Sequence, residues 1–225
     1  SNIDKGKMEV AIFAPFLCHD SSINGKEGSA LIIGAQNMHW EKSGAFTGEI
    51  SAPMLKELGC THVIIGHSER RHIFRETSEE LHKKLLAALE GNLTPVFCVG
   101  ELLEERESGS TFDVIRKQLM AGLKVMDGSD VADKIIVAYE PVWAIGTGKT
   151  ASSEDAQEVC AFIRKLLADT FGEGVAEKTI ILYGGSVKPE NTASILSMKD
   201  IDGVLVGGAS LKPDSFLGIA KAAVQ

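Results

Sequence analysis

Two residues of this chain could carry acid–base chemistry, and both follow apolar, strand-like runs. Glu140 follows the run Ile135–Ala138, with Tyr139 between them, and comes directly before Pro141. Because proline biases the preceding residue toward extended backbone, we expect Glu140 at the C-terminal tip of a strand. His67 follows a second such run, His62–Ile65, and precedes what looks like the start of a helix. A carboxylate base and an imidazole at strand ends suggest proton abstraction next to a carbonyl group.

We expect the imidazole of His67 to be neutral, because the positive end of a helix dipole disfavours the imidazolium. A neutral ring can donate its proton to a carbonyl oxygen without itself carrying charge. A lone histidine is more often a packed core or surface residue than a catalyst. We assign that ordinary role to the other five histidines, which are His19, His39, His62, His72 and His82.

The stretch after Glu140 has the composition of a hinged loop. An apolar patch, Val142–Ile145, is followed by residues 146–148, which read Gly-Thr-Gly. Glycines permit large backbone rotations, so this stretch could form a lid that makes the carboxylate more basic by excluding water. A surface loop with an anchoring Trp143 and a satisfied glutamate explains the stretch, taken alone, equally well.

Two glycine pairs at the ends of the last two apolar runs suggest a phosphate site. They are Gly184-Gly185, followed by Ser186, and Gly207-Gly208. Backbone N–H groups and helix N-termini bind anions without a net positive charge. In α/β barrels the loops after the last two strands commonly hold phosphate. Tight glycine turns between strand and helix are the ordinary alternative.

These candidate residues sit in a repeating pattern of strands and helices. Short apolar runs of this kind are typical of a parallel sheet covered on both faces. The predicted strands are Val10–Ala14, Ala30–Ala35, His62–Ile65, Pro95–Val99, Ile135–Ala138, Thr179–Leu182 and Gly203–Val206. The predicted helices are Ser51–Leu58 with Ser51 as its cap, Ser78–Leu89, Thr111–Val125, Ser153–Phe171, Pro189–Leu196 and Pro213–Ala223. We expect one domain over residues 1–225. A closed barrel requires eight strands, whereas an open doubly wound sheet accepts seven but lacks its GxGxxG motif here.

The composition argues against several other classes of function. A net charge of −8 without a basic stripe disfavours a nucleic-acid partner, and no run of about 18 apolar residues suggests a membrane span. The polar start does not resemble a signal peptide. The four cysteines lie far apart without zinc-type spacing, so we expect buried, reduced thiols of a cytoplasmic protein, with no disulfide and no metal. They are Cys18, Cys60, Cys98 and Cys160.

Seven motifs, in order along the chain, closely resemble the triosephosphate isomerase family. They are AQN (35–37), GAFTGEIS (44–51), GHSERR (66–71), CVGE (98–101), AYEPVWAIGTGK (138–149), YGGSV (183–187) and LVGGASLKP (205–213). The resemblance implies an α/β fold of the TIM (β/α)8 barrel type, with seven of the eight βα units in this chain. It also implies interconversion of dihydroxyacetone phosphate and glyceraldehyde 3-phosphate through an enediolate, in glycolysis and gluconeogenesis and without a cofactor.

The resemblance assigns roles to individual residues of the candidate site. Glu140 matches the base, His67 the neutral electrophile, and Glu69 a supporting carboxylate. The family is a well-known example of these roles and of lid closure, so they come with the resemblance. The backbone N–H groups that hold the substrate phosphate match those of Gly146, Ser186, Gly207 and Gly208.

The resemblance also implies a homodimer. The loop Gly44–Ser51 matches one that the family inserts into a neighbouring subunit, with Thr47 at its tip. Glu49 and Arg70 are expected to contribute to the same contact. The small phosphorylated triose and a second copy of the chain are therefore the partners we expect, with no nucleic acid and no membrane.

One part of the family pattern has no counterpart in this sequence. The family opens with a strand carrying a Gly-Asn-Trp-Lys block and a first helix, whereas Val10–Ala14 resembles its second strand. That block holds the family's catalytic lysine, so we expect a chain that begins at Ser1 to be poorly soluble and nearly inactive. The alternatives are a barrel-shaped phosphate-binding protein without chemistry and another phosphosugar isomerase. The second alternative gives no reason for GHSERR and YEPVWAIGTGK to occur together.

Overall fold

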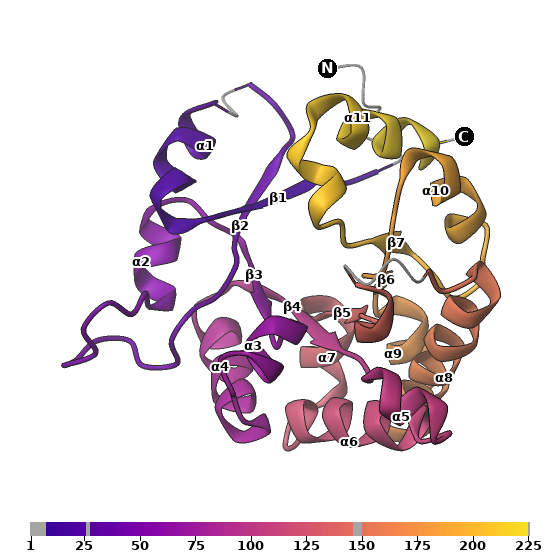
Figure 1. The fold of residues 1–225 in the computed structure, drawn as a ribbon. Coiled ribbons are helices and arrows are strands. Elements are labelled where there is room, and N and C mark those ends of the chain that lie inside the picture. The colour runs from indigo at the N-terminus through magenta and orange to yellow at the C-terminus, as the bar shows by residue number, and fades with distance from the viewer. Residues whose placement is uncertain (1–7, 26–27, 146–149, 225) are drawn as a thin grey trace. The chain divides into compact units, whose positions relative to one another are not determined.

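The computed structural model describes residues 8–25, 28–145 and 150–224, and the chain forms two compact units (Figure 1). Unit 1 comprises residues 1–97 and unit 2 residues 98–225. The chain passes from one unit into the other within strand β4, Thr94–Val99. Each unit is built from parallel strands and helices. The single domain predicted for residues 1–225 stays a prediction.

Unit 1 is built on four parallel strands that pair in chain order. Beside β4 these are β1 (Ala11–Ala14), β2 (Ile32–Ala35) and β3 (His62–Ile65). Its helices are η1 (Phe16–Cys18), α1 (His19–Gly25), α2 (Ala52–Glu57), α3 (Ser68–His72) and α4 (Ser78–Glu90). Helix α4 begins with a capping box between Thr77 and Glu80, and it buries Leu81 and Leu85 on one face.

Unit 2 continues the same alternation with three parallel strands in chain order. They are β5 (Ile136–Tyr139), β6 (Ile181–Tyr183) and β7 (Gly203–Val204). The α-helices are α5 (Leu103–Glu107), α6 (Thr111–Leu123), α7 (Gly128–Lys134), α8 (Ser153–Phe171), α9 (Glu173–Lys178), α10 (Pro189–Leu196) and α11 (Pro213–Ala222). Two 3-10 turns, η2 (Val142–Ala144) and η3 (Gly208–Leu211), follow β5 and β7.

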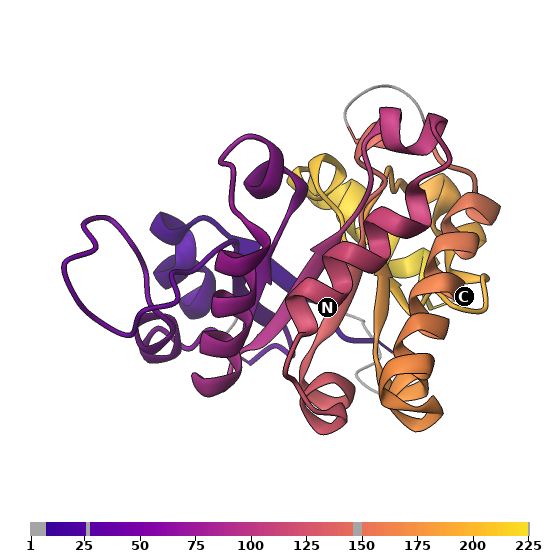
Figure 2. The same ribbon diagram turned by 90° about the horizontal axis from the view of Figure 1, so that it is seen from below.

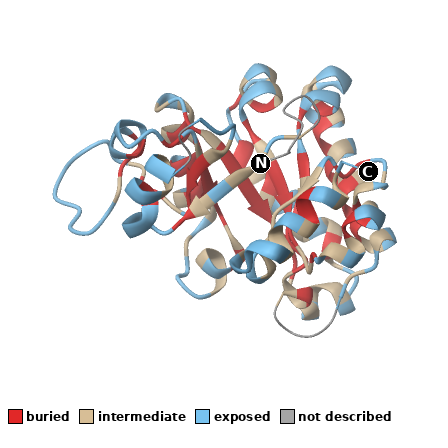
Figure 3. Ribbon diagram, turned by 90° about the horizontal axis from the view of Figure 1, so that it is seen from above, coloured by how far each residue is buried: buried red, intermediate tan, exposed pale blue. Residues whose placement is uncertain are grey.

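The strands β2 to β6 are largely buried, whereas β1 and β7 are mostly of intermediate exposure, and the outer faces of the helices are exposed (Figure 3). The buried residues of β4 and β5 run without alternation, as expected for strands covered on both faces. One long segment between β2 and α2, residues 36–51, extends away from the rest of unit 1 (Figures 1 and 2).

The predicted strands and long helices are confirmed to within a few residues. Four short helices, α1, α5, α7 and α9, were not predicted, because five to seven residues are too few for a helical apolar period to be recognised. Ser51 occupies the N-cap position of α2 as predicted, but its side chain makes no capping hydrogen bond.

The prediction of four buried thiols is wrong for one cysteine. Cys60, Cys98 and Cys160 are buried, whereas Cys18 is exposed, because the turn η1 that contains it buries none of its residues. All four are free thiols.

Across the described ranges, every helix is too short or too polar to cross a bilayer. Within the same residues, no three His, Cys, Asp or Glu side chains are grouped so that they could hold a metal ion.

Candidate functional site

Glu140 is the first residue after β5 and is 2% exposed, so its carboxylate belongs to a buried strand end. Its backbone N–H donates to the carbonyl oxygen of Val99 over 2.8 Å. At the end of β6, the N–H of Gly184 donates to Tyr139 over 2.7 Å, and a Cβ on Gly184 would lie 3.0 Å from Cγ of Glu140. Glycine at position 184 therefore leaves room for the Glu140 side chain.

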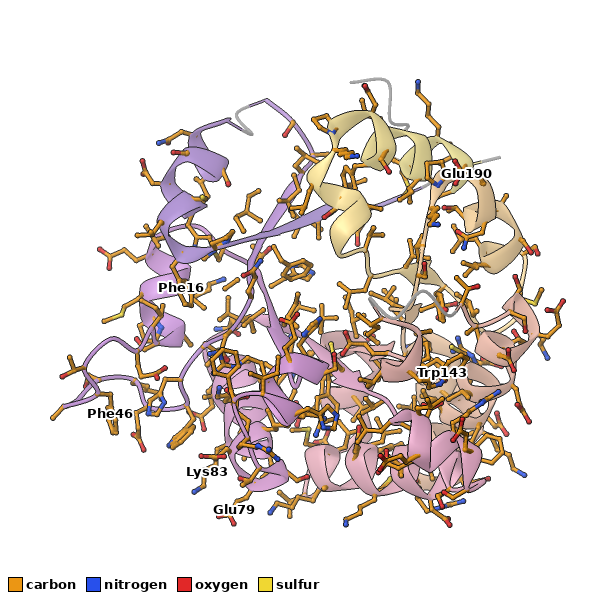
Figure 4. All side chains as sticks on the ribbon, in the orientation of Figure 1. Phe16, Phe46, Glu79, Lys83, Trp143 and Glu190 are labelled. Atoms are coloured by element: carbon orange, nitrogen blue, oxygen red, sulfur yellow. The ribbon has the colours of Figure 1, made fainter. Side chains whose placement is uncertain are left out.

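The loop after Glu140 starts with the 3-10 turn η2, which contains Trp143 (Figure 4). Glu101 fixes this turn from two sides. Its backbone carbonyl accepts from Val142 N–H over 3.1 Å, and its carboxylate Oε1 accepts from the indole Nε1 of Trp143 over 2.8 Å. Gly146, which the sequence assigns to the phosphate site, and the rest of residues 146–149 lie outside the described residues.

Glu101 is fully buried, and its Oε1 also accepts a hydrogen bond from Tyr139 Oη over 3.1 Å. Burial raises the pKa of the Glu101 carboxyl, while the hydrogen bonds and Arg106, whose Nη1 lies 3.9 Å away, oppose the rise. Burial and the nearby Glu101 charge raise the pKa of Tyr139, so its hydroxyl remains a donor. Sequence analysis gave Glu101 no role, although its position at the end of a strand in the CVGE motif was a signal.

Arg106 in α5 connects Glu101 and Trp143 to the start of helix α8. Its guanidinium Nη2 lies 2.6 Å from Oδ1 of Asp155, and its Cζ lies 5.4 Å from the centre of the Trp143 ring. Asp155 is part of the capping box that starts α8, together with Ser152. The chain on both sides of residues 146–149 is therefore held by the single segment 101–106.

His67 lies in unit 1, between the end of β3 and the start of α3. Its ring nitrogen Nδ1 accepts a hydrogen bond from the backbone N–H of Glu69 over 3.3 Å, and its carbonyl accepts from Arg70 N–H over 2.8 Å. A nitrogen that accepts a hydrogen bond carries no proton, so the proton of the neutral ring lies on Nε2. This arrangement supports the expected neutral donor. The Glu69 carboxylate lies 3.7 Å from Nδ1 and is largely exposed.

The predicted phosphate positions in unit 2 lie at two strand–helix junctions. Ser186 follows β6, and its carbonyl accepts from the side chain of Asn191 over 3.0 Å. Gly207 and Gly208 are exposed where η3 begins, and a Cβ on either would meet no atom within 4 Å. Space for a ligand atom therefore exists next to both glycines.

The predicted dimer-contact residues all belong to unit 1. Thr47 is exposed in the turn closed by the hydrogen bond from Glu49 N–H to the Phe46 carbonyl, 3.0 Å. The Glu49 carboxylate lies 3.9 Å from Nδ1 of His39, and Arg70 pairs with Glu76 over 2.6 Å. Unit 1 thus carries His67, Glu69 and the dimer-contact residues, and unit 2 carries Glu140, Ser186 and the two exposed glycines.

Comparison with known proteins shows which family this chain resembles in sequence. The family model described as triosephosphate isomerase matches residues 1–223. A triosephosphate isomerase from Alkaliphilus metalliredigens (strain QYMF) is 54% identical over 212 residues, which are 94% of this chain and 85% of the relative. Triosephosphate isomerases from Alkaliphilus oremlandii (strain OhILAs) and Carboxydothermus hydrogenoformans are each 52% identical, covering 96% and 98% of this chain and 87% and 88% of the relatives.

Replacing Glu101 with Gln should change how stability depends on pH. Because burial raises the pKa of Glu101, its contribution to stability is complete below the unfolded value, about 4.3, and is lost as the pH rises through the higher folded value. Glutamine stays neutral and can still accept from Trp143 and Tyr139. We therefore expect the free energy of unfolding of Glu101→Gln, relative to the wild type, to increase with pH.

The measurement is denaturant unfolding of both proteins from about pH 4.5 to pH 8, a range that starts at the ordinary glutamate pKa. Trp143→Phe is the matched control, since it removes one donor but leaves the titrating carboxylate in place. A difference between Glu101→Gln and the wild type that stays constant over this range would contradict the raised pKa.

Proposed function

Because this chain belongs to the triosephosphate isomerase family, we propose that Glu140 and His67 carry out the reaction that gives the family its name. The protein interconverts dihydroxyacetone phosphate and glyceraldehyde 3-phosphate, a reaction of glycolysis and gluconeogenesis. Its fold is the α/β barrel type of that family.

Glu140 is the general base. It removes a proton from the substrate carbon next to the carbonyl group and returns it to the neighbouring carbon, which converts the ketose into the aldose through an enediolate. The observation that carries this role is the burial of its side chain at a strand end whose backbone is held by Val99 and Gly184. A fixed, desolvated carboxylate needs little rearrangement to reach the transition state.

His67 is the electrophile. With Nδ1 accepting from Glu69 N–H, Nε2–H of the neutral ring donates to the substrate oxygen on which negative charge develops. Glu69 supports this state mainly through its backbone N–H, which fixes the tautomer. A neutral donor leaves no strong ion pair to be broken when the proton moves back.

Replacing Glu140 with Gln removes the proton acceptor and keeps the shape of the side chain. We expect kcat to fall by several orders of magnitude, since general base catalysis alone contributes about 10²–10⁴. The measurement is the rate of isomerisation in both directions, with thermal unfolding to show that the fold is kept. Glu173→Gln, on the exposed helix α9, is the control and should keep normal turnover. Normal turnover in Glu140→Gln itself would exclude this residue as the base.

The substrate phosphate is held by backbone N–H groups of Ser186, Gly207 and Gly208, with Gly146 as a fourth donor. The exposed glycines at the start of η3 and the space beside them support this placement. Backbone donors of this kind bind an anion without a lysine or arginine.

Adding a side chain at this position should weaken phosphate binding. In Gly208→Val we expect the inhibition constant of inorganic phosphate to rise about ten-fold or more, since one hydrogen bond to a charged group contributes about 1.5–3 kcal/mol. Gly174→Val is the matched control, because Gly174 is also an exposed helical glycine with no atom within 4 Å of an added Cβ. Equal inhibition of both variants would place the anion elsewhere.

We further propose that the protein is a cytoplasmic homodimer whose contact is centred on the segment Gly44–Ser51. Unit 1 exposes large apolar side chains on this segment and on η1 and the end of α3, namely Phe16, Leu17, Phe46, Ile73 and Phe74 (Figure 4). Isologous pairing about a two-fold axis would bury the same apolar surface on both subunits. Thr47, Glu49 and Arg70 supply polar contacts in this interface.

A charge at the centre of the interface should separate the subunits. Phe46→Asp removes two apolar contacts from a symmetric dimer, each contributing about 1.5 kcal/mol or more, so the dissociation constant should rise about a hundred-fold or more. Light scattering over a concentration series measures the dissociation constant of the dimer. The control is Leu217→Asp in unit 2, because Leu217 is 45% exposed and Phe46 is 42% exposed. A dimer equally stable in both variants would contradict this interface.

A further inference from the structure

We propose that Gln118 of helix α6 is a positioning residue for Glu140, which it controls through the backbone of Gly100. The inference rests on the proposed role of Glu140 as the base. Gln118 lies 22 positions before Glu140 in the sequence and belongs to none of the seven family-like motifs. It is partly buried, on a helix that stands outside the strands.

The side chain of Gln118 makes a two-point clamp on a single residue. Its Oε1 accepts from the backbone N–H of Gly100 over 2.9 Å, and its Nε2 donates to the carbonyl of Gly100 over 2.9 Å. Both peptide groups that flank Gly100 are therefore fixed in position and in rotation. The neighbours of Gly100 accept backbone hydrogen bonds from the segment after β5, Val99 from Glu140 and Glu101 from Val142, so the clamp acts on the residue between these two contacts.

Gly100 in turn lies against the backbone of Glu140. A Cβ on Gly100 would overlap the carbonyl oxygen of Glu140, so the two backbones are in close contact. The N–H of Glu140 also donates to Val99, the residue before Gly100. Any shift of the Gly100 peptide is thus transmitted to the backbone from which the catalytic carboxylate extends.

Helix α6 is a rigid support for the clamp. The residues next to Gln118 on the inner face, Ile115, Leu119 and Leu123, are all buried. A side chain placed by a packed helix can hold a partner within the few tenths of an ångström that catalysis requires.

The simpler explanation is that the clamp only stabilises the fold. The chain contains a second clamp of the same kind, and comparing the two clamps distinguishes stabilisation from positioning. Gln157 of α8, also partly buried, binds Asp200 in the same two-point manner. Its Nε2 donates to Oδ2 of Asp200 over 2.6 Å, and its Oε1 accepts from the N–H of Asp200 over 3.0 Å. In the described part of the chain, the side-chain hydrogen bonds of Gln157 and Asp200 join them to each other and to Arg164, and none reaches a residue assigned to the site.

The experiment compares Gln118→Leu with Gln157→Leu in the whole protein. Leucine keeps most of the side-chain volume and removes both hydrogen bonds in each case. We expect similar falls in melting temperature, but a loss in kcat of roughly 10- to 100-fold only in Gln118→Leu. KM should change much less than kcat, because the phosphate contacts lie on other segments. Equal kcat values in the two variants would overturn the proposal.

Gln118→Glu gives a second test that does not depend on leucine being tolerated. A protonated carboxyl group can both donate to and accept from Gly100, whereas a carboxylate can only accept and faces the Gly100 carbonyl. We expect kcat of Gln118→Glu, relative to the wild type, to be low at about pH 8 and to recover as the carboxyl is protonated in acid. Wild-type kcat at every pH would overturn the clamp's role.

The outcomes also separate this inference from the assignment of the base. If Glu140→Gln keeps normal turnover, the base assignment fails and with it the inference. If Glu140→Gln is inactive while Gln118→Leu behaves like Gln157→Leu, the base assignment stands and the inference alone is wrong.

Discussion

The burial of the Glu101 carboxylate is the interaction on which the described part of the site in unit 2 depends. An ionisable group with no exposure must be surrounded by donors, because an unpaired buried charge costs several kcal/mol. Tyr139 and Trp143 supply the hydrogen bonds and Arg106 an opposite charge. These partners come from β5, from η2 and from α5, and all three face Oε1, whereas Oε2 is buried without a hydrogen-bond partner among the described residues. The contacts of a single carboxylate oxygen therefore fix the relative positions of three segments.

The carboxylate that we propose as the base is placed by backbone contacts and by glycines at neighbouring positions. Glu140 has its N–H bound to Val99, while Gly100 and Gly184 leave the space that its backbone and its Cγ occupy. The backbone at Glu140 is thereby fixed, so the base that we propose at this position needs little rearrangement to reach the transition state.

The strands and long helices could be predicted from the sequence, and so could the two groups that we propose react, but the residues that support them could not. Apolar runs locate the strands, and Glu140 and His67 are recognisable because they follow such runs. The supports join positions that are distant along the chain: Gln118 is 18 residues from Gly100, Trp143 is 42 from Glu101, and Arg106 is 49 from Asp155. No local spacing predicts such pairs, since they exist only once the strands are side by side. The exposure of Cys18 has a local cause, because the short turn η1 that contains it buries none of its residues.

The phosphate site that we propose explains how an acidic protein can bind an acidic substrate. A net charge of −8 repels a phosphate at long range, but salt screens that repulsion beyond about 8 Å at physiological ionic strength. Within that distance the local donors decide, and backbone N–H groups at exposed glycines present partial positive charge without a titrating group. A site built this way keeps its donors at every pH at which the protein is folded.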